Sequence, residues 1–187
     1  IAPGLADIAQ IYGGRPAGAW LPVDGVHAAA LRQRLLADRA HDRVIGLAWQ
    51  PTASALGGLE PFAPLLDVPG IRWVALPMGA VTPGLSQMLA APNSPLLYES
   101  TWMSNGLGSI AGLLGALDLL ISSEDLAATL AGAVGKPVWK MAGVNAHWSW
   151  GTEGAATKWH PTARVIRATQ ATETLIADLA QFVAGRP

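Results

Sequence analysis

The sequence predicts an α/β protein: a Rossmann-like, three-layer domain with a mainly parallel sheet. Apolar runs of strand length alternate with helix-length segments whose apolar residues recur at helical spacing, and this alternation indicates right-handed crossovers between parallel strands. The run Leu119–Ile121 contains no polar residue, which is typical of a strand buried on both faces. With 51% hydrophobic and 13% charged residues among 187, the chain has ample apolar surface for such a core.

The start of the chain differs in character from the rest. Residues Ile1 to Val23 are rich in glycine and proline and have only weak apolar periodicity, so we expect a connector or the remnant of a preceding domain. Residues 24–187 are expected to form one domain, which begins with an amphipathic helix over His27–Arg39 and a strand over Val44–Trp49. The elements expected next are helices over Glu60–Asp67, Gly84–Ala91 and Gly106–Leu117, and strands over Ile71–Leu76 and Leu96–Tyr98.

The stretch Asp118–Trp139 predicts a strand, a tight turn, a helix and the start of another strand. Ser122 and Ser123 follow the first strand and can accept hydrogen bonds from the first amides of the helix, and the two acids after them complement its dipole. Gly135 supplies a left-handed cap, and Pro137 ends the helix. The residues expected on its buried face are Leu126, Leu130, Ala133 and Val134.

The remaining elements close the domain. Those expected are strands over Val138–Met141 and Arg164–Arg167 and a helix over Thr172–Val183. Trp73 and Trp139 lie inside strands and are expected in the core. An aromatic loop separates the last two strands, and its His147, Trp148 and Trp150 are candidates for stacking on a sugar or a base.

Composition excludes several classes of function. A net charge of -1 with no basic block leaves no electrostatic footprint for nucleic acid or an anionic membrane. The absence of cysteine excludes disulfides and thiolate zinc sites and is compatible with a reducing compartment, so we expect a cytoplasmic protein. The uncharged region Trp73–Tyr98 is broken repeatedly by proline, so no membrane span is expected. His147 and His160 have no partners at metal-ligand spacing, so no metal site is expected.

The turn from Ser122 to Asp125 is the first candidate for a binding site, because ligands of open α/β sheets bind at the carboxyl ends of the strands. One of the carboxylates of Glu124 and Asp125 accepts hydrogen bonds from sugar or ribose hydroxyls, or else both only complement the helix dipole. Lys140 ends the next strand, where its ammonium either pairs with a diphosphate or is solvated. Thr52 follows the first strand and can offer a hydroxyl to an anion.

Gly106, Gly108 and Gly112 form a run that resembles a dinucleotide-binding loop. Such a loop follows the first strand of its fold and is matched by an acid on the next strand, whereas this run lies in mid-domain without that acid. Helix packing is therefore the preferred explanation of the glycines. The helix amino terminus from Ser104 to Gly108 can still hold a phosphate oxygen.

Four blocks of the sequence, taken together, point to a family. They are RVIGLAW, DLLISSEDLAATLAGAVGKPVW, HWSWGTEG and KWHPTARVIR, in that order. In order and spacing they resemble the carboxyl-terminal half of heptosyltransferase-like glycosyltransferases, and most of all the bacterial proteins that attach this domain to tetratricopeptide repeats. The resemblance extends from Leu21 to the end of the chain.

The resemblance implies that the chain is the second, donor-binding half of a GT-B fold. In the family the first half binds the acceptor and supplies the catalytic base, so this chain alone is expected to bind a nucleotide sugar as a substrate without turning it over. Its missing partner would be that N-terminal half or a repeat domain. The implied reaction moves a hexosyl or heptosyl group to a protein or glycan and needs no cofactor. The alternative is a degenerate, non-catalytic module that binds proteins.

The family's donor motif, D-T-x-x-x-H-L-A-G-A, is only partly kept. Glu124 and Asp125 stand at the Asp-Thr pair and Thr129 stands at the histidine, while the framework from Leu130 through Trp139 matches the family. The segment Thr52–Gly58 is neutral where the family usually has basic residues. The resemblance implies no particular catalytic residue in this half. The residues expected to bind the donor are Ser122, Ser123, Glu124, Asp125, Thr129, Lys140, Ser104, Gly108 and Thr52.

Overall fold

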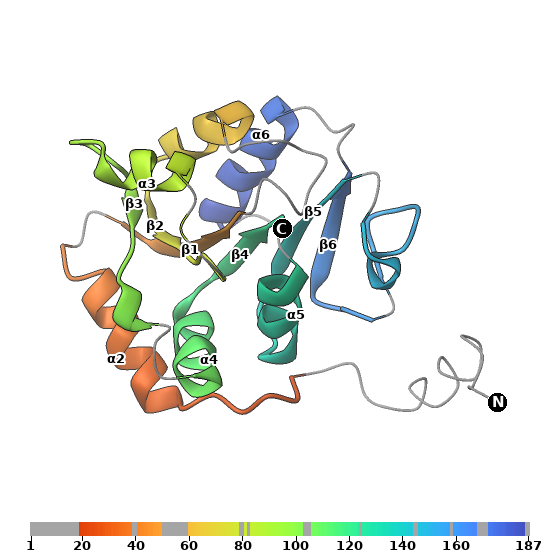
Figure 1. The fold of residues 1–187 in the computed structure, drawn as a ribbon, viewed down its shortest axis with the longest axis horizontal. Helices are drawn as coiled ribbons and strands as arrows, with labels where there is room; N and C mark the ends of the chain where they lie inside the picture. The colour runs from red at the N-terminus through yellow and green to blue at the C-terminus, as the bar shows by residue number, and fades with distance from the viewer. Residues whose placement is uncertain are drawn as a thin grey trace.

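The computed structural model describes residues 19–38, 41–49, 60–78, 81, 83–102, 106–123, 125–143, 146–157, 159–167 and 172–185. Its strands form one parallel sheet of six, in the order β3-β2-β1-β4-β5-β6 (Figure 1). They are β1 (Arg43–Ala48), β2 (Ile71–Ala75), β3 (Leu96–Leu97), β4 (Leu119–Ser122), β5 (Val138–Ala142) and β6 (Ala163–Arg167). The predicted Rossmann-like α/β fold is confirmed, and every predicted strand is present close to its expected bounds.

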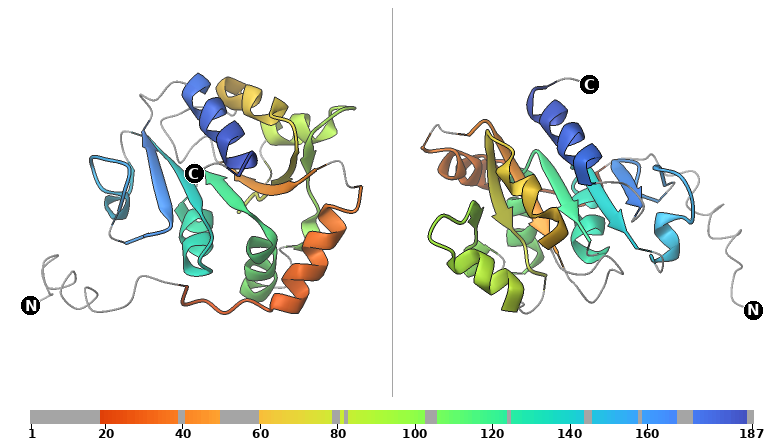
Figure 2. Two further views of the ribbon diagram at one scale, coloured as in Figure 1. Left: turned by 180° about the vertical axis from the view of Figure 1, so that it is seen from behind. Right: turned by 90° about the horizontal axis from the view of Figure 1, so that it is seen from above.

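Helices cover both faces of the sheet, which makes three layers (Figures 1 and 2). One face carries α2 (Gly25–Leu35), α4 (Leu107–Ala116) and α5 (Asp125–Ala133), and the other carries the 3-10 helix η1 (Glu60–Asp67), α3 (Pro83–Ala90) and α6 (Thr172–Val183). Two further 3-10 helices are η2 (Ser100–Trp102) and η3 (Trp148–Trp150). The predicted helix at Glu60–Asp67 is therefore of the 3-10 type, and Pro64 inside it has no amide to donate to an α-helical ladder.

The core is divided by the sheet into two apolar clusters. In β4, Leu120 belongs to the cluster under α2, α4 and α5, while Leu119 and Ile121 belong to the cluster under η1 and α6. This alternation confirms that β4 is buried on both faces. Trp73 and Trp139 are buried as expected. Within the described residues, no helix is long and apolar enough to cross a membrane.

The ends of two helices follow from local sequence. The carboxylate of Asp24 caps α2, accepting hydrogen bonds from the amides of Val26 and His27 at 3.0 Å each. At the end of α5, Gly135 has a φ of +78° and donates to the carbonyl of Gly132, and the amide of Lys136 donates to Ala131, both at 2.9 Å. This pair of bonds is a Schellman motif, so the predicted left-handed glycine cap is confirmed.

One residue of α5 was assigned to the wrong face. Leu126 was expected on the buried face, but its side chain is 51% exposed. The helix instead approaches the sheet on Ala127, Ala128 and Ala131, which are completely buried. Small side chains let the two backbones approach closely, so the alanines and not the leucine define the centre of the buried face.

The glycine run that resembles a dinucleotide loop has different roles along its length. A Cβ on Gly112 would lie 2.6 Å from Cδ2 of His27, so this glycine allows α4 to pack against α2. Gly106 is the N-cap residue of α4 and has a φ of +78°, a conformation that favours glycine. A Cβ on Gly108 would meet no atom within 4 Å. Helix packing therefore explains Gly112 but not Gly108.

Part of the expected connector packs against the domain. The amides of Trp20 and Leu21 both donate to the carbonyl of Ala133, at 2.8 and 2.9 Å, which places residues 19–23 along the ends of α5 and α4. A Cβ on Gly115 of α4 would lie only 2.6 Å from Val23 Cγ1. Residues 1–18 lie outside the described residues.

Candidate functional site

The strand order places the candidate site between β1 and β4. From β1 the chain builds the sheet outward through β2 and β3, and from β4 it builds in the opposite direction through β5 and β6. In open α/β sheets, ligands bind outside the carboxyl ends of the strands at such a switch point. The register aligns Ala48 with Ser122 and Ser122 with Lys140, so these three residues form one row at that edge.

The turn that leaves β4 is anchored to its neighbour β1. Ser122 and Ser123 are both buried, and the amide of Ser123 donates to the carbonyl of Ala48 at 3.0 Å. This bond continues the ladder one residue beyond β4. The chain therefore enters α5 from a position fixed by the sheet.

Lys140 is buried below this turn. Its side chain is only 3% exposed, and its ammonium donates to the carbonyl of Ser123 at 2.6 Å and to that of Met141 at 3.2 Å. The Nζ atom also lies 5.6 Å from the centre of the Trp150 ring. A buried ammonium needs such partners to offset lost hydration. Lys140 is therefore not at a solvated strand end; it connects β5 to the turn that opens α5.

Trp150 covers this lysine and is inaccessible. The indole has no exposed surface and stacks on His160, with ring centres 4.0 Å apart. Its carbonyl accepts a hydrogen bond of 3.0 Å from Nη2 of Arg167 on β6. Trp150 was a candidate for stacking on a sugar, but in this position it belongs to the core and supports the site from within.

The other two aromatic candidates lie on the outside of η3. Trp148 is 53% exposed, and its ring contacts Trp159 edge-on and His147 in a tilted arrangement, with 5.1 Å between centres in each case. Nδ1 of His147 accepts the amide hydrogen of Ser149 at 3.4 Å, which caps η3. The same short helix therefore buries Trp150 and presents Trp148, and only His147 and Trp148 remain able to stack on a ligand.

The structure places the remaining predicted residues as follows. Gly108 is in the first turn of α4, and Thr129 is half-buried in α5. Thr52, Ser104 and Glu124 lie outside the described residues, as does the side chain of Asp125, which begins α5. No group of three or more His, Asp or Glu side chains that could hold a metal ion occurs in the described part of the chain. The predicted residues that the structure brings together are Ser122, Ser123, Lys140 and Trp150.

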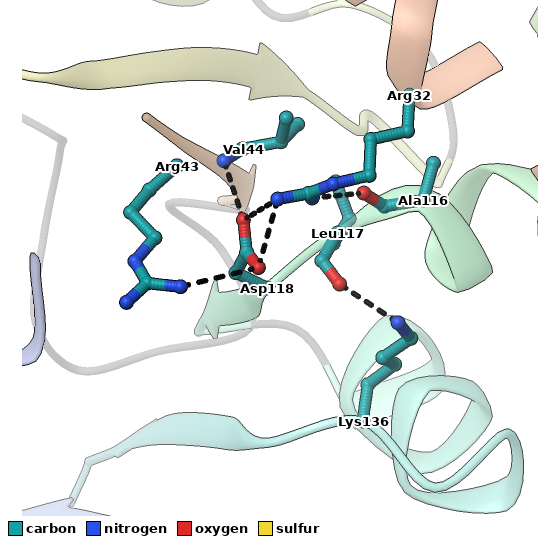
Figure 3. A network of polar contacts seen from close by, with 7 residues as sticks. All are labelled: Arg32, Arg43, Val44, Ala116, Leu117, Asp118 and Lys136. Atoms are coloured by element: carbon teal, nitrogen blue, oxygen red, sulfur yellow. Dashed lines mark hydrogen bonds and ion pairs between the residues drawn. The ribbon is translucent and has the colours of Figure 1, made fainter. Parts of the chain in front are cut away.

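A polar network at the opposite end of β4 was not predicted (Figure 3). The Asp118 carboxylate accepts the Val44 amide at 2.8 Å and pairs with Nη2 of Arg32 at 2.9 Å, and Nη1 of Arg43 lies 3.8 Å away. Arg32 also donates to the carbonyl of Ala116 at 2.9 Å. The only sequence signal was an acid directly before an apolar run. Its partners lie 74 and more residues away in sequence, so local patterns could not identify them.

Lys136 joins the edge of this network (Figure 3). Its ammonium donates to the carbonyl of Leu117 at 2.9 Å. Burial is the main cause that lowers the pKa of Lys136 from 10.5; Arg32 lowers it further, while the negative charge of Asp118 acts in the opposite direction.

Neither a scan against protein-family models nor a search of curated proteins found a match to this chain.

Proposed function

We propose that this chain is the nucleotide-sugar-binding half of a bacterial glycosyltransferase, inactive without its N-terminal half. The observation that carries the proposal is the switch point between β1 and β4, where β4 ends at Ser122 and α5 begins at Asp125. The four sequence blocks that resemble heptosyltransferase-like enzymes supply the donor class. The transferred group would be a hexose or heptose, and the acceptor a protein or glycan.

The amino terminus of α5 would bind the diphosphate of the donor. The first amides of a helix point outward with the positive end of its dipole, which suits an anion. Thr52–Gly58 contains no cationic residue, so backbone amides have to carry more of this binding than in related enzymes.

Lys140 would act on the donor indirectly. Its ammonium is occupied by the carbonyls of Ser123 and Met141, so it would hold the turn and orient the first amides of α5. This role replaces the direct pairing with a diphosphate expected from the sequence. His147 and exposed Trp148 are the described aromatic candidates for contact with the sugar.

Calorimetric titration with UDP-, GDP- and ADP-sugars tests the proposal. We expect saturable binding of at least one donor, weakened about tenfold or more by Lys140→Met, because misdirected amides lose charge-assisted hydrogen bonds to the diphosphate. Lys136→Met is the matched control, since it removes a half-buried lysine at the opposite edge of the sheet. Circular dichroism would establish that both variants fold.

If none of the nucleotide sugars gives a binding signal in the titration, this proposal is wrong and the alternative remains, a degenerate module that binds proteins. One observation favours that alternative. Leu107 and Leu126, in the first turns of α4 and α5, expose apolar side chains at the helix ends where the polar nucleotide sugar would be expected to bind. If Lys140→Met leaves the affinity for the nucleotide sugar unchanged, the proposed donor site stands but the proposed role of Lys140 is wrong.

A further inference from the structure

A polar pocket lies between α2, the segment that contains η2, and the first turn of α4. Its volume is about 240 Å³. Leu31 forms part of its wall. The polar side chains that line it are His27 and Arg34 from α2, Glu99 and Thr101 from around η2, and Ser109 from α4. None of these residues belongs to the turn between β4 and α5, although Ser109 is adjacent to Gly108, one of the residues expected to bind the donor.

The polar groups of the pocket are held in place by one another. Nη2 of Arg34 pairs with Oε2 of Glu99 at 3.2 Å, and the hydroxyl of Thr101 donates to Oε1 at 2.5 Å. The carboxylate is therefore oriented by both of its oxygens. These contacts join α2 to a segment 65 residues away in the sequence.

The two opposite charges of the pocket disfavour a simple anion or a simple cation as its ligand. An anion would face the Glu99 carboxylate, and a cation would face the Arg34 guanidinium. A molecule with several hydroxyls satisfies both groups, because a hydroxyl can donate to a carboxylate oxygen and accept from a guanidinium N–H. The hydroxyl of Ser109 adds a further donor and acceptor.

The size of the pocket limits the ligand further. Pockets for drug-sized ligands usually measure roughly 300–1,000 Å³, so 240 Å³ is too small for a nucleotide sugar. We propose that this pocket binds a neutral polyhydroxyl molecule of the size of one monosaccharide. The side chains of Arg34 and Glu99 are 67% and 45% exposed, so we expect an affinity of about millimolar.

Nuclear magnetic resonance titration of the 187-residue chain tests this site. The probes are methyl α-glucoside, methyl α-mannoside and myo-inositol, with inorganic phosphate as the anionic comparison. We expect at least one neutral probe to shift the amide signals of Arg34, Glu99 and Ser109 in a saturable way. Arg34→Ala and Glu99→Gln should each weaken that binding about tenfold, the loss of one charge-assisted hydrogen bond. Gln33→Ala, on the exposed side of α2, should leave it unchanged.

Three outcomes would overturn the proposal. The first is the absence of saturable shifts with all three neutral probes. The second is stronger binding of phosphate at the same amides, which would make the pocket an anion site. The third is a sugar response at Ser123 and Lys140 that survives both pocket substitutions. Titration with nucleotide sugars tests the turn between β4 and α5, whereas titration with the neutral probes tests the pocket. Failure of the proposed function is therefore distinguishable from failure of the pocket proposal.

Discussion

The two ends of β4 hold charge in different ways. At the amino end, the Asp118 carboxylate is surrounded by the opposite charges of Arg32 and Arg43 and by a backbone amide. At the carboxyl end, the Lys140 ammonium is buried below Trp150 and donates to the carbonyls of Ser123 and Met141. Side chains from distant parts of the chain surround the Asp118 carboxylate, whereas the Lys140 ammonium donates to main-chain carbonyls beside it.

This difference assigns different tasks to the two ends. The contacts of Asp118 join α2, β1 and β4, so they contribute to the stability of the whole domain. Lys140 donates to the carbonyl of Met141 and to that of Ser123, which lies in the turn that opens α5 at the switch point of the sheet. Changes at the amino end should therefore alter stability alone, and changes to Lys140 should also alter the shape of the turn that opens α5.

The largest expected effect is at the carboxyl end, where Trp150 covers Lys140. Trp150→Ala removes a completely buried indole, and we expect the free energy of unfolding to fall by about 3–5 kcal/mol. Trp148→Ala, two residues away on the exposed side of η3, should cost about 0.5 kcal/mol or less. Urea denaturation followed by circular dichroism measures both. If the two substitutions lower the free energy of unfolding equally, Trp150 does not shield Lys140 from solvent.

A somewhat smaller effect is expected at the amino end. Asp118→Asn keeps the shape of the side chain but leaves Arg32 and Arg43 without their negative partner, at a cost of about 2–3 kcal/mol. Asp178→Asn is the control, because its partner Arg164 is 41% exposed and such a pair contributes about 1 kcal/mol at most. If both substitutions cost the same, the Asp118 network is no more than a surface ion pair, and the contrast between the two ends fails.

Local patterns were sufficient to predict the strands and the α-helices of this fold, although not its short 3-10 helices. Strands such as Leu119–Ser122 are short apolar runs, and the cap at Gly135 depends on a glycine directly after a helical pattern. The burial of Leu126 was predicted wrongly because periodicity alone does not show which side of a helix comes closest to the sheet. The alanines at 127, 128 and 131 decide that, through their size.

Local sequence patterns could not predict the environment of the candidate site. Lys140 is buried because Trp150, in a loop that follows its strand, folds back over it, and no spacing rule relates the two. Asp118 is paired through residues that only the sheet order brings together. In both cases the charged residue was visible in the sequence, whereas its partner depends on tertiary structure.

The smallest expected effect concerns Lys136, at the edge of the Asp118 network. Burial lowers its pKa in the folded state, so between that lowered value and 10.5 the unfolded chain binds more protons than the folded one. Stability from this group should therefore rise with pH across that interval and stay constant below it. We expect the free energy of unfolding of the wild type to increase relative to that of Lys136→Met as the pH is raised from neutral to 10.5, measured by urea denaturation at each pH. A decrease would mean that the attraction of Asp118 outweighs burial and that Lys136 is a full member of the network at the amino end.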